Sequence, residues 1–260
     1  MLEYEFMRRA FIVGLLLATI IPCIGVTIVL KRLSMMGDAL SHASLAGVAA
    51  GLVIGINPIL GAVIVTVFAG FGINIIRKKF PKYAEISIAI VMSAGVGLAG
   101  VLSGFTDNSS GFTSFLFGSI VAITDFELYL VVFLAVIVML AFLLLYKELM
   151  YISFDEEGAR LAGIAVKSVD FIFTILTALT VAIASRTVGA LIVSSIMVIP
   201  VACAMRFTKS YKMTVIMSIL FALVFTTIGL VLSFYLGLKP GGTIVLAGVI
   251  TLIISMIVKK

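Results

Sequence analysis

Long apolar runs, separated by short polar breaks, make up most of this chain. The runs are about 18 to 22 residues long, and a helix needs about 20 apolar residues to cross the hydrocarbon core of a bilayer. The pattern therefore predicts about nine membrane-spanning helices, with a range of eight to ten. We expect them at residues 10–30, from the thirties to 56, and at 58–76, 85–104, 125–146, 171–185, 188–205, 213–236 and 242–258.

The length of the apolar runs also decides the fold class. A transmembrane β-barrel would show strands of alternating apolar and polar residues instead of long continuous runs. The composition agrees with helices, since 63% of the residues are hydrophobic, 12% are charged and the mean hydropathy is +1.33. We therefore predict an all-α polytopic membrane protein in which residues 1–260 form a single transmembrane domain.

Two segments depart from this pattern. Residues 106–113 are polar, and residues 112–124 are apolar but too short to span, so we expect a surface or re-entrant piece there. Residues 147–170 form the longest hydrophilic stretch, and within it residues 155–163 have the pattern of a short helix ended by glycine. This stretch is either a solvated connector or carries a helix on the cytoplasmic face where a soluble partner docks.

The net charge of +6 does not indicate nucleic-acid binding. It bears on the orientation of the chain in the membrane, because excess Lys and Arg in membrane proteins mark cytoplasmic loops. The densest basic loop, residues 77–82, is therefore expected inside the cell. Counting spans from it places Arg8 and Arg9 outside, as the single exception to the rule. It also predicts a protein of the cell membrane with a cytoplasmic C-terminus. The other segments expected inside are residues 31–32, 147–170, 206–212 and 259–260.

Residues 37–44, with the sequence GDALSHAS, contain the only histidine of the protein. Asp38 precedes His42 by four residues, which on a helix places both side chains on one face. A carboxylate and an imidazole at this spacing suit a divalent transition metal, since imidazole favours such ions over calcium and magnesium. Two ligands make half a site at most, so other helices, water or a second copy of the chain would supply the rest.

Asp38 also has a purely structural interpretation. It follows a basic turn and a glycine, so it is a good N-cap, and His42 would then be a polar residue one turn into the helix. If the helix begins near Arg32 instead, His42 lies ten residues further on, or about 15 Å at the usual rise. That depth is near the middle of the bilayer, where ionisable residues are costly and usually functional.

Catalysis by the chain itself is not indicated. There is no second histidine, and neither a P-loop nor a G-x-S-x-G motif occurs. Cys23 and Cys203 lie inside or at the end of apolar runs, so we expect small buried residues that form neither a disulfide nor a metal site. Transport driven by ATP would therefore need a separate ATPase subunit.

The stretch from Lys31 to Ala43 resembles the signature of the membrane permease subunit of manganese/zinc-type ABC importers. The similarity extends over essentially the whole chain, because three further segments resemble that family in the expected order. These are residues 116–120 (LFGSI) before the central spans, residues 146–163 as a coupling-helix loop, and residues 188–200 as a late motif.

The resemblance implies a type II ABC importer fold and a homodimer with the translocation path at its interface. Two ATP-binding subunits would dock on the coupling helices, an extracytoplasmic metal-binding protein would deliver the ion, and no cofactor would be bound tightly. Asp38 and His42 would be transient metal ligands or gates of the path for zinc, manganese or iron. The residues that would dock the ATPase are Phe154, Asp155, Glu156, Glu157, Ala159 and Gly163.

Two other functions stay open. An ion-coupled secondary carrier would use Asp38 and His42 as a proton or cation relay. A structural membrane scaffold would leave this pair without a function. A copurifying ATPase subunit distinguishes the importer from the carrier. The transported metal is not readable from the sequence, because aspartate and histidine suit zinc, manganese and ferrous iron alike.

Overall fold

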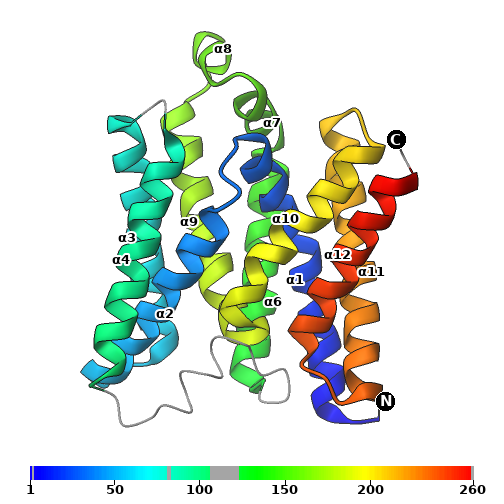
Figure 1. The fold of residues 1–260 in the computed structure, drawn as a ribbon. Coiled ribbons are helices and arrows are strands. Elements are labelled where there is room, and N and C mark those ends of the chain that lie inside the picture. Colours follow the sequence, from blue (N-terminus) through cyan, green and yellow to red (C-terminus); the bar gives the residue numbers. More distant parts are fainter. Residues whose placement is uncertain (2, 81–82, 106–122, 259–260) are drawn as a thin grey trace. The chain divides into compact units, whose positions relative to one another are not determined.

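The computed structural model describes residues 1, 3–80, 83–105 and 123–258, and within them every regular element is a helix (Figure 1). Among these described residues, eight helices are long and apolar enough to cross a membrane, and α10 (Ala190–Phe207) is a shorter apolar helix. The prediction of an all-α polytopic protein is confirmed. The eight are α1 (Glu5–Leu30), α2 (Met36–Ile54), α3 (Pro58–Lys79), α4 (Ala84–Ser103), α6 (Asp125–Leu144), α9 (Val166–Ala184) with η2 (Ser185–Gly189), α11 (Tyr211–Leu236) and α12 (Pro240–Val258).

Several expectations concern residues outside the described ones. The polar segment at 106–113 lies there, and so does the motif at 116–120. The short apolar piece expected at 112–124 is described only at Ile123 and Thr124, and Thr124 caps α6 by accepting a hydrogen bond from the backbone N–H of Glu127.

The helix expected at 171–185 begins earlier than the sequence pattern indicates. In the structure α9 starts at Val166, and its first turns include the charged Asp170. A guanidinium nitrogen of Arg77 lies 3.5 Å from the Asp170 carboxylate. Because this ion pair neutralises the carboxylate, Asp170 is tolerated inside the helix. The hydropathy pattern had indicated that Asp170 lies in the polar segment before the helix. The next helix follows without a loop, and Gly189 has φ of 109°, which ends the α-helical path before α10.

The described residues form two compact units, each assembled from separate parts of the chain. Unit 1 consists of Met1–Arg32, Ser119–Phe154 and Ser195–Lys260, and unit 2 consists of Leu33–Gly118 and Asp155–Ser194.

In unit 1, α1 packs against α6 and α11, and α11 packs against α12. Arg9 pairs with Asp125 at 2.8 Å and with Glu5, and it donates to the backbone carbonyl of Ile123. Arg9, one of the two arginines that the charge rule places on the unexpected side, is thus neutralised by two carboxylates. At the other end of α1, the hydroxyls of Thr27 and Tyr211 lie 3.1 Å apart. Cys23 and Cys203 are fully buried, as predicted.

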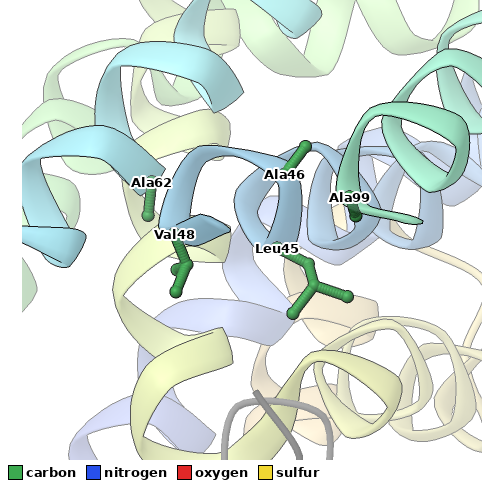
Figure 2. Packing of buried hydrophobic residues seen from close by; sticks show 5 residues of the cluster. All are labelled: Leu45, Ala46, Val48, Ala62 and Ala99. Carbon is green, nitrogen blue, oxygen red and sulfur yellow. The ribbon is translucent and has the colours of Figure 1, made fainter. Parts of the chain in front are cut away.

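In unit 2, α2 is the central helix and contacts α3, α4 and α9 (Figure 1). Small side chains allow these close approaches. Figure 2 shows Ala62 of α3 and Ala99 of α4 beside α2, where they belong to one buried cluster with Leu45, Ala46 and Val48. In membranes, such small residues let helix backbones approach closely, and dispersion contacts then stabilise the packing.

Gly47 marks the closest approach of α2 to α3. A methyl group there would lie 2.7 Å from Cα of Ala62 and would also meet the carbonyl oxygen of Gly61. We expect Gly47→Ala to force the helices apart and to lower the free energy of unfolding by about 1–3 kcal/mol, the usual cost of overpacking. Thermal unfolding of the detergent-solubilised protein measures this. Gly100→Ala is the matched control, since a methyl group there meets open space; equal unfolding temperatures for the two variants would contradict the assignment.

Candidate functional site

The start of α2 determines where Asp38 and His42 lie. The helix begins at Met36, after a turn in which the N–H of Met36 donates to the carbonyl of Leu33. Its N-cap is Met35, without a side-chain cap, so the interpretation of Asp38 as the N-cap is wrong. The alternative start near Arg32 is also wrong, because Arg32 lies in the preceding turn with φ of 57°. His42 therefore lies about 9 Å along the helix axis from Met36.

Asp38 and His42 lie on a face of α2 that is only partly buried within unit 2. Both side chains are partly exposed, whereas Ala39, Ser41 and Ala43 between and beside them are buried. The carboxylate is in the first turn of the helix, where the positive end of the helix dipole favours a negative charge. The predicted one-face arrangement is confirmed as local geometry, and it leaves both groups able to meet a ligand.

Two contacts within unit 2 hold the turn that carries His42. Gly95 of α4 lies directly against its backbone, so closely that an added methyl group would be 2.9 Å from the nitrogen of Ala43. On η2, the Ser185 hydroxyl donates to the Ser41 hydroxyl at 3.4 Å, and both side chains are buried. Neither residue was predictable from the sequence, because a glycine and a serine in apolar runs carry no local sign of their partners.

Among the described residues, no group of three or more His, Cys, Asp or Glu side chains is placed to hold a metal ion. In that part of the chain, Asp38 and His42 are thus two candidate ligands without a third from the same copy. A carboxylate and an imidazole fit the donor set that divalent transition metals take in proteins.

The second candidate surface is the hydrophilic stretch at 147–170, most of which is helical. Its first helix is α7 (Tyr146–Phe154), which belongs to unit 1 and ends at the exposed Phe154. The ring of Phe154 packs edge-on against Tyr211 at a centroid distance of 6.3 Å, and Tyr146 packs against the same ring. This aromatic cluster ties α7 to the start of α11.

The helix expected at 155–163 is confirmed as α8 (Glu156–Leu161), which belongs to unit 2. Asp155 is its N-cap and accepts a hydrogen bond from the backbone N–H of Gly158 at 2.9 Å. Gly163 follows the helix with φ of 85°, a left-handed conformation that favours glycine.

The side chains of α8 divide into a buried and an exposed face. Ala159 is buried and Glu157 is exposed, while Glu156 pairs with Arg160 at 3.5 Å. Ala159 therefore packs the helix onto its unit rather than presenting a side chain to a partner. Leu161 is 89% exposed, and the sequence analysis missed it. An apolar residue in the last turn of a polar helix is the signal that would have identified it.

The sequence pattern of the ABC 3 transport family matches residues 3–259 of this chain. The chain belongs to the ABC 3 transport family. A protein of Treponema pallidum named "probable metal transport system membrane protein" is 35% identical over 98% of this chain and 96% of its own length. The "manganese transport system membrane protein MntC" of Listeria monocytogenes is 30% identical over 99% of this chain and 92% of its own length.

A solved structure described as "PsaBC from Streptococcus pneumoniae in complex with Fab" is similar in fold and sequence. It superposes with a TM-score of 0.86 and 26% identity, covering 97% of this chain and 91% of that one. Membership of the family makes this chain a multi-pass membrane permease subunit of an ABC transporter, which is not itself catalytic. It favours the permease over an ion-coupled secondary carrier.

Proposed function

We propose that this chain is the membrane permease subunit of an ATP-driven importer of divalent transition-metal ions, with Asp38 and His42 as transient ligands in the translocation path. The observation that carries the proposal is the family match over residues 3–259. Similar proteins are named for manganese transport and for zinc uptake. The Asp38–His42 pair supplies the chemistry, since it lies on one partly exposed face of α2.

A homodimer completes the metal site. One copy offers a carboxylate and an imidazole, so two copies meeting along this face of α2 offer two of each. Such a set suits manganese or zinc, and the ion is cargo rather than a tightly bound cofactor. The site must bind weakly enough to release its ion, which is the general requirement for conduction through a pathway.

The partners follow from the ABC architecture. An ATP-binding subunit docks on the cytoplasmic side against α8, whose first turn is acidic and whose Leu161 is exposed. The exposed Phe154, which directly precedes the Asp155 cap in the chain, is a further predicted docking residue. An extracytoplasmic metal-binding protein delivers the ion on the other side. The basic loops place α8 and the C-terminus in the cytoplasm by the positive-inside rule.

In this arrangement transport proceeds by alternating access. ATP binding and hydrolysis in the partner move the coupling helix, and the dimer interface opens first outward and then inward around the metal site. The permease residues hold the ion by charge and by imidazole nitrogen, without a covalent step.

The dependence on ATP tests the proposal against the secondary carrier. We expect the chain to copurify with its ATPase subunit, and the reconstituted complex to take up Mn²⁺ or Zn²⁺ only with ATP enclosed in the proteoliposome lumen. The measurement is metal uptake with the delivering protein outside, with ATP or with an imposed pH gradient alone. Uptake driven by the pH gradient without ATP would refute the importer and establish the carrier.

A further inference from the structure

We propose that Gly95 of α4 and Ser185 of η2 are positioning residues for His42, and that they tune which divalent ion the site prefers. Both residues contact the α2 turn that carries the imidazole rather than the ion itself. The inference rests on the proposed function of Asp38 and His42 as metal ligands.

Gly95 allows α4 to lie close to this turn, because it has no side chain. A methyl group at this position would lie 2.9 Å from the backbone nitrogen of Ala43 and 3.0 Å from the carbonyl carbon of His42. Carbon atoms in contact are about 3.5–4.0 Å apart, so the helices would separate by about 0.5 Å. No side-chain rotation relieves the clash, because both obstacles are backbone atoms.

The requirement for glycine is specific to this position on α4. Gly97 and Gly100 of the same helix face open space, where an added methyl group meets nothing within 4 Å. Alanine is the better helix former, so neither of these positions needs glycine for packing. Gly95 differs from them only in what it touches, which is the His42 turn.

Ser185 holds the same turn by a different element. Its hydroxyl donates to the hydroxyl of Ser41, the residue immediately before His42, and both groups are buried. Ser185 is the first residue of a π-helical segment, a rare geometry that is frequent at functional sites. Thr187 in the same segment instead donates to the carbonyls of Ile183 and Ala184, so its hydroxyl serves its own helix.

The position of this turn matters because the proposed site is shared by two copies. A metal site requires ligand distances correct to within about 0.2 Å. A shift of about 0.5 Å in each copy changes the separation of the two imidazoles by up to about 1 Å. Ions of different preferred geometry respond differently to such a change, so the ratio of manganese to zinc uptake is a sensitive measure of it.

The test compares uptake of Mn²⁺ and Zn²⁺, alone and in competition, by cells that carry each variant with the ATPase and the binding protein. We expect Gly95→Ala to raise KM about tenfold and to change the manganese-to-zinc ratio, as loss of outer support does in metal sites. Gly97→Ala should match the wild type. Gly47→Ala, whose methyl group would meet the backbone of α3, should lower abundance and so shows the effect of a general packing defect in α2.

Ser185→Ala provides a second variant that removes one hydroxyl without adding volume. We expect it to raise KM by about threefold, the effect of losing one hydrogen bond, and to change the manganese-to-zinc ratio. Thr187→Val should leave both unchanged. Wild-type KM and ratio in Ser185→Ala and in any folded Gly95→Ala protein would overturn the positioning role. With that result, loss of uptake in His42→Ala would mean that only the positioning role is refuted. Wild-type uptake in His42→Ala would instead refute the proposed function itself.

Discussion

Asp38→Asn and His42→Ala should each reduce metal uptake by about 100-fold or more in cells that carry the chain with its partners. Each would remove one of the two proposed ligand types of a single copy, and in the proposed two-fold dimer each substitution would remove two ligands at once. Losing outer support alone costs about 10–100-fold at metal sites, so losing a ligand should cost at least as much. Uptake of Mn²⁺ and Zn²⁺, measured at equal membrane abundance, checks this.

Glu85→Gln is the control for the carboxylate, because Glu85 is an exposed acid in the first turn of another helix of unit 2. It should transport like the wild type. If both Asp38→Asn and His42→Ala keep wild-type uptake, the pair does not belong to the path and the metal site must be sought elsewhere.

Glu156→Lys should separate the permease from its ATPase and reduce ATP hydrolysis by the complex about tenfold or more. The substitution reverses a charge in the first turn of α8 and breaks the pair of Glu156 with Arg160. An ATPase surface complementary to the acidic turn would then face a like charge, which costs several kcal/mol at an interface. The helix itself should persist, since its Asp155 cap and buried Ala159 are unchanged. Copurification of the ATPase and ATPase activity of the purified complex are the measurements.

Leu161→Ala tests the apolar part of the same helix. Glu3→Lys is the charge-matched control for Glu156→Lys, because Glu3 is an exposed acid outside α8. Leu161→Ala should weaken copurification, and Glu3→Lys should leave it intact. Normal assembly and ATP hydrolysis in Glu156→Lys would show that α8 does not dock the ATPase.

The helical architecture was predictable from the sequence because a bilayer imposes a strong and local constraint. Every backbone group in hydrocarbon must be bonded within its own helix, so each span reveals itself as one apolar run. The same locality made α8 predictable, since Asp155 and Gly163 at its ends carry their cap conformations without distant partners. That Asp38 and His42 share one helix face was equally predictable, because residues four positions apart on a helix lie on the same face.

The first residue of each helix was harder to predict, because it depends on contacts with residues outside the helix. Asp38 is a good N-cap by type, yet α2 begins at Met36, whose N–H donates to the carbonyl of Leu33 in the turn before it. Asp170 reads as the polar flank of a span, yet it lies within α9 because Arg77, far away in the sequence, neutralises it. Ala159 reads as part of an exposed docking helix, yet it is buried against its unit.

The sequence alone determined that this chain spans a membrane as a bundle of helices, and that it carries one carboxylate–imidazole pair. Apolar run length and helical periodicity are local properties, so no partner is needed to read them. Only the tertiary structure decided that Gly95 and Ser185 hold the turn of His42. A glycine in an apolar run looks the same whether it meets open space or a backbone, and packing between distant helices makes the difference.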